Sequence, residues 1–440
     1  MNAIISPHAL AGSIPSIASK SAAHRLLILA ALSPSITDID CRTTSDDIDA
    51  TISCLQALGA RITATKLGFR VVPIAVGASS TQPRLIKGAL LDCGESGSTL
   101  RFLLPVSCAL GAKATLTGHG RLAERPLSPL YEQLCEHGCE LSKKGVLPLQ
   151  TQGQLTGGRF FLPGNVSSQF ASGLLLASPF LDKPTEVFVL APVQSAPYIR
   201  LTIDALESFG VAVGLSDHVL NGHQYRRYAI GGGCLRSPGK IVVEGDWSNA
   251  AFWLAAGSIG HATVEVRGLK ADSSQGDRAI LAALARFGAR VMRGPGAVAV
   301  SGGKLEGITL DVSGFPDLVP PLAAVATFAE GKTRLTNAGR LRLKESDRLV
   351  SVSNALTALG GHAQIENDDL IIEGSSSIVG GLVDAENDHR IAMMAAIVAA
   401  QADGPTTIRG AQCVAKSYPN FFDDFAGLGG QVSPHDCEEN

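Results

Sequence analysis

The sequence predicts an α/β fold in which one structural repeat occurs six times, three times in each of two similar domains. The first observation is a recurring pattern of apolar residues three apart, then Gly, then an alternating apolar run. This pattern is typical of a helix that ends in a left-handed glycine and leads directly into a strand. Its glycines are Gly59, Gly138, Gly210, Gly288, Gly360 and Gly429. One such joint is common in any α/β protein, but six of them 69 to 79 residues apart indicate repeats of one unit.

A second observation lies 25 to 30 residues before most of these glycines, where an Ala/Leu-rich helix precedes a strand that begins near Thr. Segments 252–256, 322–328 and 391–400 of these helices are almost wholly apolar, and helices that are apolar on all sides are buried. Each repeat therefore reads as helix, strand, loop, helix, glycine, strand. The strands begin at Ile36, Ala114, Thr185, Ala262, Thr333 and Thr406.

Length and composition are the third observation. A chain of 440 residues is too long for one simple core and suits two domains. Its 45% hydrophobic and 18% charged residues supply a core and argue against disorder. The pattern passes from the third to the fourth repeat near 238–240, which predicts a domain boundary there.

Charge and targeting signals argue against several classes of protein. A net charge of −3 and a pI near 6.4 disfavour a nucleic-acid or membrane surface. Residues 1–10 lack a secretory pattern, and no apolar run reaches the length of a membrane span. The nine cysteines are scattered without CxxC pairs, so we expect small buried thiols in a reducing cytosol rather than disulfides or a zinc site.

Cations occur where the first buried helix is predicted to begin. Segment 19–25 leads into the predicted helix 26–32 and carries Lys20 and Arg25, although a helix dipole disfavours cations in the first turn. An anion bound by free N–H groups, Ser21 and both cations would explain them. The alternative is that both side chains extend into solvent.

Two neighbouring segments carry related chemistry. In segment 94–101 of the second repeat, Gly97 lets a ligand approach the backbone, and Ser98 and Thr99 are candidate helix caps. In the first repeat Asp46 is explained as the cap of the next helix, and we expect Asp47 to orient a nearby cation.

The other repeats carry polar segments at helix starts or after strands. Loop, turn and cap chemistry is the ordinary alternative for each, and alternation in 340–348 predicts that several of its charges share one face. The segments are 124–126, 167–170, 195–198, 244–249, 316–318, 340–348, 388–390 and 416–419.

Taken together, the cations predict a pocket for a small polyanion, because the repeat would bring these segments to the same end of each unit. Two carboxylates among them, Asp317 and Glu345, would not help to bind phosphate and suggest proton transfer. The cations are Lys20, Arg25, Arg101, Arg125, Lys344, Arg348, Arg390 and Lys416.

In this order the motifs resemble those of the enolpyruvyl transferase family, and within it the branch whose acceptor is shikimate 3-phosphate. The resemblance extends from the first residues to about Phe422. It rests on Lys20-Ser21 with Arg25, Ser96-Gly97 with Arg101, and segments 124–126, 167–169, 344–348, 388–390 and 416–419.

The resemblance implies two domains, each of three βαβαββ repeats, that close over the substrates in a cleft between them. The implied domains are 18–239, and 1–17 together with 240–440. It also implies transfer of the enolpyruvyl group of phosphoenolpyruvate to the 5-hydroxyl of shikimate 3-phosphate, with release of phosphate. We expect no cofactor or metal, no nucleic-acid or membrane partner, a monomer and a cytoplasmic location.

Site residues carried over by position fall into three groups. The expected phosphoenolpyruvate ligands are Lys20, Gly97, Arg125, Gln169, Arg348, Arg390 and Lys416. The expected shikimate 3-phosphate ligands are Lys20, Ser21, Arg25, Ser167, Ser168, Gln169, Ser195, Tyr198, Asp317 and Lys344. The resemblance assigns Asp317 to removal of the 5-hydroxyl proton, Glu345 to proton exchange at the enol methylene, and Lys20 to the catalytic set.

Two positions depart from the family pattern. Arg340 stands where some members have Asn, which puts that phosphate contact in question, and His24 is expected to pack or to lie at the surface. Because Gly97 has no methyl group, a compact phosphonate such as glyphosate is expected to fit the phosphoenolpyruvate pocket.

Two rival functions remain open. UDP-N-acetylglucosamine enolpyruvyl transferases are similar, but they have a Cys in the loop that corresponds to 110–126, which has none, and Asn in place of Ser21. A ring-shaped nucleic-acid scaffold is the other, and the acidity of the chain counts against it.

Overall fold

The computed structural model describes residues 1–74, 86, 88–144, 146–232 and 234–435. The chain divides into two compact domains. The continuous domain is Lys20–Val243, and the split domain is Met1–Ser19 together with Glu244–Asn440. The sequence placed the boundary a few residues earlier, at 238–240.

Six four-stranded sheets share one strand order within the described residues. In each, two parallel strands are followed by an antiparallel pair, as β6, β7, β9 and β8 illustrate. Three sheets belong to each domain, and helices connect their strands in a βαβαββ order. The predicted α/β fold of repeated units is confirmed.

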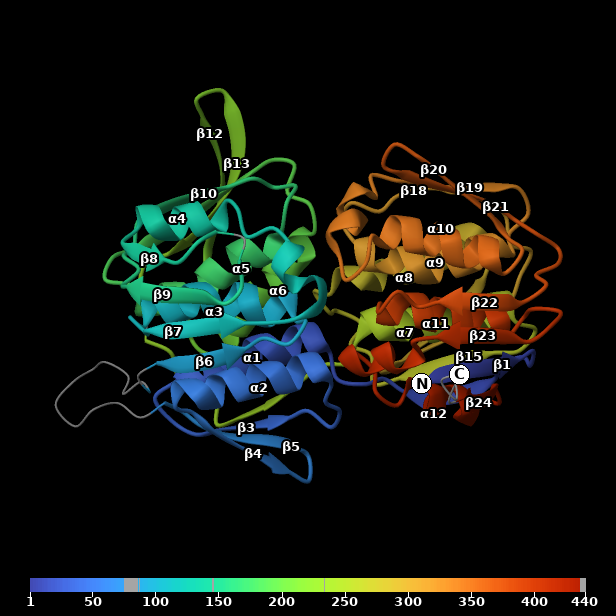
Figure 1. The fold of residues 1–440 in the computed structure, drawn as a ribbon, viewed down its shortest axis with the longest axis horizontal. Coiled ribbons are helices and arrows are strands. Elements are labelled where there is room, and N and C mark those ends of the chain that lie inside the picture. The colour runs from blue at the N-terminus through green and yellow to red at the C-terminus, as the bar shows by residue number, and fades with distance from the viewer. Residues whose placement is uncertain (75–85, 87, 145, 233, 436–440) are drawn as a thin grey trace. The chain divides into compact units, whose positions relative to one another are not determined.

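The continuous domain contributes three of these sheets (Figure 1). In spatial order their strands are β14 (Lys240–Val242), β3 (Thr37–Asp40), β5 (Gly68–Val72) and β4 (Arg61–Thr65); β6 (Ala89–Asp92), β7 (Ala114–Thr117), β9 (Leu149–Gly153) and β8 (Cys139–Leu141); and β10 (Arg159–Leu162), β11 (Thr185–Leu190), β13 (His223–Ile230) and β12 (Gly214–Leu220). Its helices are α1 (Lys20–Leu32), α2 (Asp46–Leu58), α3 (Gly97–Ala109), α4 (Leu130–Glu136), α5 (Ser168–Ala177) and α6 (Ala196–Ser208), with 3-10 turns η1 (Gly120–Glu124) and η2 (Ser178–Phe180).

The split domain contains the other three sheets. Their strands are β2 (Gly12–Pro15), β15 (Val264–Arg267), β17 (Ala297–Ser301) and β16 (Arg290–Gly294); β18 (Thr309–Asp311), β19 (Lys332–Thr336), β21 (Asp369–Glu373) and β20 (His362–Glu366); and β22 (Gly381–Asp384), β23 (Thr406–Arg409), β1 (Asn2–Ser6) and β24 (Gln431–His435). Its helices are α7 (Trp247–Ile259), α8 (Ile280–Phe287), α9 (Val319–Thr327), α10 (Arg348–Ala358), α11 (His389–Ala399) and α12 (Phe421–Gly427), with 3-10 turns η3 (Gly276–Ala279), η4 (Pro316–Leu318), η5 (Gly339–Leu343) and η6 (Ala411–Lys416).

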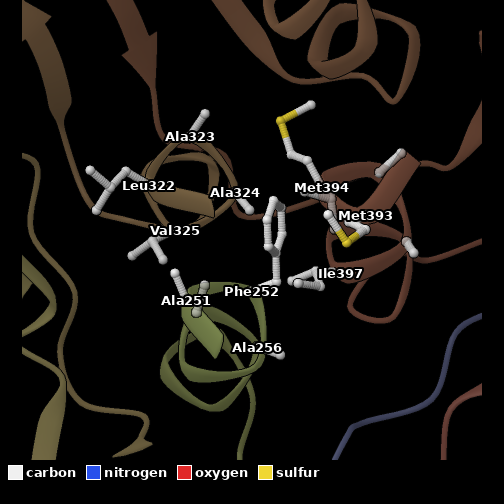
Figure 2. Packing of buried hydrophobic residues seen from close by; sticks show 14 of the residues in the cluster. Ala251, Phe252, Ala256, Leu322, Ala323, Ala324, Val325, Met393, Met394 and Ile397 are labelled. Atoms are coloured by element: carbon white, nitrogen blue, oxygen red, sulfur yellow. The ribbon is translucent and has the colours of Figure 1, made fainter. Parts of the chain in front are cut away.

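One apolar helix from each repeat lies inside its domain. In the split domain α7, α9 and α11 pack against one another, and Phe252 of α7 lies between Ala324 of α9 and Ile397 of α11 (Figure 2). All three side chains are fully buried. Small alanines let the helix backbones approach, while Phe252 fills the space between them. In the continuous domain α1, α3 and α5 pack against one another in the same way.

The helix–glycine–strand joints confirm the repeat pattern. All six predicted glycines have left-handed backbones, with φ between 82° and 117°. The third joint differs from the expectation, because β12 begins at Gly214 rather than directly after Gly210. Non-glycine residues are strained at such φ values, so each position favours glycine.

Several helix starts differ from the prediction. Helix α1 begins at Lys20, so Arg25 lies more than one turn inside it rather than before it. Ser45, not Asp46, caps α2, and Ser96, not Ser98 or Thr99, caps α3. In both cases the true cap is the residue whose extended backbone turns its hydroxyl toward the first free N–H groups.

Cysteine burial was only partly predicted. The eight cysteines in the described part of the chain carry free thiols, but Cys135 and Cys234 are exposed, contrary to the expectation of burial. Both lie at surface positions, Cys135 on the outer face of α4 and Cys234 in the loop before β14. Cys437 lies outside the described residues. Among the residues that the structure describes, we find no helix long and apolar enough to cross a bilayer.

Candidate functional site

In the continuous domain the first candidate group is an ion pair between two helix starts. Lys20 is the first residue of α1 and Asp47 the second residue of α2. Lys20 Nζ lies 2.7 Å from Asp47 Oδ2, and both side chains are 14% exposed. The prediction that Asp47 orients a cation is confirmed. The pairing opposes the unfavourable effect of the helix dipole on Lys20 and fixes the ammonium group.

Arg25 is a buried guanidinium group held by neutral oxygens. Its Nε donates to Thr202 Oγ1 at 2.7 Å and its Nη2 to the carbonyl oxygen of Tyr198 at 2.9 Å, while Nη1 donates to the carbonyl oxygen of Ser21. Burial lowers the pKa of Arg25 to about 9, so the group stays charged at neutral pH. Across the described residues no carboxylate forms an ion pair with it, so an anion is favoured beside it.

Gly97 lies against two further guanidinium groups. A Cβ atom at this position would be 2.6 Å from Arg101 Nη1 and 2.7 Å from Arg125 Cζ, so only glycine leaves room for both. Arg101 Nη1 donates to Gln169 Oε1 at 2.9 Å, and Gln169 Nε2 donates to Ser98 Oγ at 2.9 Å. The starts of α3 and α5 and the Arg125 loop therefore form one connected group.

The remaining predicted residues of this domain lie at the starts of α5 and α6. Ser167 caps α5 by accepting the N–H of Gln169, and Ser168 is buried beside it. Ser195 precedes α6 with a left-handed φ of 54°, which is uncommon for a residue other than glycine. Tyr198 lies in the first turn of α6 and contacts Arg25 through its carbonyl oxygen.

In the split domain, Arg348 is the centre of a carboxylate cluster. It begins α10, is 1% exposed, and its Nε lies 2.8 Å from Asp388 Oδ2. Its Nη1 lies 2.9 Å from Asp317 Oδ1 and its Nη2 2.5 Å from Glu345 Oε2. Burial opposes the charge of Arg348, but the three carboxylates raise its pKa above the ordinary value. Arg348 thus holds both predicted proton-transfer groups in fixed positions.

Asp317 also contacts two other predicted residues. Its Oδ1 lies 3.0 Å from Lys344 Nζ and its Oδ2 3.7 Å from Arg390 Nη2. Burial alone would raise the pKa of Asp317, but Lys344, Arg390 and Arg348 hold it well below the ordinary value. Asp317 is therefore ionised and can accept a proton, and it becomes a stronger base when a bound anion neutralises these cations.

Lys344 and Lys416 are the other two predicted site cations in this domain. Burial lowers the pKa of Lys344, although Asp317 opposes this effect. Lys416 ends η6, is 9% exposed, and donates from Nζ to the carbonyl oxygen of Asn387 at 2.7 Å. Asn387 directly precedes Asp388, so Lys416 lies beside the Arg348 cluster.

Two features of this cluster were not predicted from sequence, a 3-10 turn in segment 340–348 and the role of Asp388. Residues Gly339–Leu343 form the 3-10 turn η5, and Lys344 and Arg348, which follow it, both contact Asp317 Oδ1. Arg340 lies within this turn. Asp388 is fully buried and accepts from Arg348, Ser346 and the N–H of Arg390. Its place as an acid just before an apolar helix was the only available signal.

Two other observations limit the chemistry. His24, expected to pack or to lie at the surface, is fully buried on α1. In the described part of the chain, no group of three or more His, Cys, Asp and Glu side chains is arranged to hold a metal ion.

Comparison with known proteins finds relatives that match nearly the whole chain. A sequence model of the family described as EPSP synthase (3-phosphoshikimate 1-carboxyvinyltransferase) matches residues 4–425. Relatives named 3-phosphoshikimate 1-carboxyvinyltransferase include one from Clostridium kluyveri, 39% identical over 97% of both chains, and one from Clostridioides difficile, 38% identical over 97% of both.

A solved structure gives the same result at the level of the fold. The EPSP synthase of Acinetobacter baumannii superposes with a TM-score of 0.79 at 26% identity, and the alignment covers 98% of this chain and 100% of that one. An alignment of this extent includes both domains. The chain belongs to the EPSP synthase family.

Proposed function

We propose that this protein transfers the enolpyruvyl group of phosphoenolpyruvate to the 5-hydroxyl of shikimate 3-phosphate, as an enzyme of the shikimate pathway. The observation that carries the proposal is the ionised Asp317 among Lys344, Arg348 and Arg390. A carboxylate in a cluster of cations suits a reaction that joins two phosphorylated anions and moves protons between them.

The proposed ligands of each substrate follow the family positions. Phosphoenolpyruvate would contact Lys20, Gly97, Arg125, Gln169, Arg348, Arg390 and Lys416. Shikimate 3-phosphate would contact Lys20, Ser21, Arg25, Ser167, Ser168, Gln169, Ser195, Tyr198, Asp317 and Lys344. Each proposed set draws on residues of both domains. Arg25, buried without a carboxylate partner among the described residues, supports a phosphate group in its vicinity.

The proposed chemistry is an addition followed by an elimination. Glu345, protonated, gives a proton to C3 of phosphoenolpyruvate, and C2 becomes electrophilic. The 5-hydroxyl oxygen then bonds to C2 while Asp317 takes its proton. In the second step C3 returns a proton to Glu345, the C2–O bond to phosphate breaks, and inorganic phosphate leaves. Lys20 and the guanidinium groups stabilise the charge that develops on phosphate.

The ion pair between Glu345 and Arg348 bears on the first step. In the protein alone, Arg348 favours the ionised form of Glu345, which cannot donate a proton. A substrate carboxylate bound to Arg348 would compete for this guanidinium group and weaken the pair. Binding of phosphoenolpyruvate would then free Glu345 from this ion pair at the moment when a proton donor is needed.

A phosphate-release assay tests the function. Inorganic phosphate should appear only when shikimate 3-phosphate and phosphoenolpyruvate are both present. The substitution Asp317→Ala should reduce kcat at least about a thousandfold, because it removes the group that accepts the hydroxyl proton. Equal turnover with UDP-N-acetylglucosamine as acceptor would overturn the proposal in favour of the related transferase. We further propose that the protein is a monomer, which sedimentation of the purified protein would check. We also propose a cytoplasmic location.

A further inference from the structure

One series of buried hydrogen bonds joins α1, α2 and α3, and the first turns of α1 and α3 carry the proposed ligands Lys20 and Gly97. His24 Nδ1 on α1 lies 2.7 Å from Thr51 Oγ1 on α2, and Thr51 Oγ1 lies 2.7 Å from Thr99 Oγ1 on α3. All three side chains have no exposed surface. Polar contacts this deep in a domain are retained only when they are satisfied, and they fix geometry more strictly than apolar contacts do.

The contacts of Thr99, the last residue of this series, determine which atom donates in each of its hydrogen bonds. Thr99 Oγ1 lies 2.8 Å from Ser96 Oγ, to which it donates, and 3.4 Å from the carbonyl oxygen of Asp47. A hydroxyl group has only one proton, so a Thr99 that donates to either oxygen must accept from Thr51. Thr51 has then used its own proton and must accept from His24. The His24 ring therefore carries its proton on Nδ1.

The other ring nitrogen agrees with this tautomer. Within the residues that the structure describes, His24 Nε2 is buried without a hydrogen-bond partner, so a proton there would have no acceptor. Burial, and then the charges of Lys20 and Arg25, lower the pKa of His24 well below its ordinary value. The imidazole is neutral and acts as a donor of one hydrogen bond.

The Thr99 end of this series of hydrogen bonds reaches two residues beside the ligands proposed for phosphoenolpyruvate. Asp47 holds Lys20 at 2.7 Å, and Ser96 caps α3 directly before Gly97. The guanidinium group proposed for shikimate 3-phosphate is held from elsewhere, because Arg25 bonds to Thr202 and Tyr198 of α6. Lys20 and Gln169 belong to both proposed sets, but Gly97 and Arg25 depend on separate supports.

We propose that His24 is a positioning residue for phosphoenolpyruvate, acting through Thr51 and Thr99 to fix the Lys20–Asp47 pair relative to the start of α3. This inference rests on the proposed function and adds a residue to it. Loss of one buried link is expected to disturb the binding of phosphoenolpyruvate more than that of shikimate 3-phosphate, which shares Lys20 but has Arg25 and the starts of α5 and α6 as further proposed ligands.

Steady-state kinetics of four variants test this inference. Thr51→Val and His24→Leu each remove one link and should raise KM for phosphoenolpyruvate about tenfold, the effect of losing a buried hydrogen bond, with KM for shikimate 3-phosphate within about twofold of wild type. His24→Asn offers an amide N–H where Nδ1–H lies and should restore KM to within about threefold of wild type. The matched control is Thr327→Val, a buried hydroxyl on α9 that bonds within its own helix and should change neither KM.

The result separates the inference from the function on which it rests. A wild-type protein that releases no phosphate from the two substrates overturns the proposed function. If the wild type is active but Thr51→Val changes neither KM, or raises both equally, the positioning role is wrong. NMR of the ring nitrogens in histidine-labelled wild-type protein gives an independent reading that needs no folded variant. An Nδ1–H signature for His24 supports the inference, and an Nε2–H signature overturns it.

Discussion

At Gly97 the backbone lies so close to Arg101 and Arg125 that one methyl group would displace a guanidinium group. The guanidinium groups of Arg101 and Arg125 stand on flexible aliphatic stems and can shift slightly. The Gly97→Ala protein should therefore fold, with both guanidinium groups displaced by less than the diameter of an atom. We expect KM for phosphoenolpyruvate to rise about tenfold, and inhibition by a compact phosphonate such as glyphosate to weaken by a larger factor. Inhibition curves against phosphoenolpyruvate for both proteins measure this difference.

A second glycine provides the control for that substitution. Gly427→Ala adds a methyl group on α12, where no heavy atom lies within 4 Å of the new Cβ, and should leave KM and inhibition unchanged. Unchanged inhibition of Gly97→Ala would mean that the guanidinium groups near Gly97 do not line the phosphonate site.

The contacts of a site residue could be predicted where its partner lies close to it in the sequence pattern. Lys20 and Asp47 form the predicted kind of cation–carboxylate pair because both stand in the first turns of the two helices of the first repeat. The environment of Arg25 could not be predicted, since its partners Thr202 and Tyr198 are more than 170 residues away in the chain. The same applies to the Thr51–Thr99 link, which depends on how two helices pack.

Two helix caps in the split domain show how an element depends on its first residue. Asp388 caps α11, is fully buried, and also binds Arg348 at the start of α10. Asp388→Ala leaves a buried guanidinium group short of a partner and should lower the free energy of unfolding by about 3–5 kcal/mol. Asp347 caps α10, but its side chain is 36% exposed and pairs with the half-exposed Arg342. Asp347→Ala should therefore cost only about 1 kcal/mol.

Urea unfolding of the two variants and the wild type, followed by circular dichroism, gives both differences. Equal losses for the two substitutions would show that Asp388 acts as a cap alone, without a further contribution from its pairing with Arg348.

At the level of elements, glycine joints were easier to predict than caps. A left-handed backbone between a helix and a strand favours glycine, so each joint shows a glycine at the same place in the apolar pattern. All six predicted glycines have the expected backbone conformation. A cap is chosen among adjacent polar residues by backbone angles that sequence does not show. Ser45 was therefore missed beside Asp46, and Ser96 beside Ser98.

At the scale of the whole molecule, the number of repeats could be predicted from the sequence. The pairing of strands that lie far apart in the chain could not be predicted from the periodicity. Strand β14 completes a sheet with β3, some 200 residues earlier in the chain, and it is only three residues long. The resemblance implied that the N-terminal strand joins the later domain, and β1 pairs with β23 and β24 there. Such pairings depend on chain topology, which a local pattern of apolar residues does not contain.

The same topology predicts that the two domains differ in their ability to fold alone. The continuous domain, Lys20–Val243, contains every strand of its three sheets. The fragment 244–440 lacks β2 and β1, and without β1 the strand β24 loses the strand with which it pairs among the described residues. We expect the fragment 20–243 to unfold cooperatively in urea, whereas the fragment 244–440 should do so only when a peptide of residues 1–19 is added. Circular dichroism and amide exchange of both fragments measure this. Cooperative unfolding of 244–440 by itself would mean that the N-terminal strands add to a domain that is already stable, rather than completing one that cannot form without them.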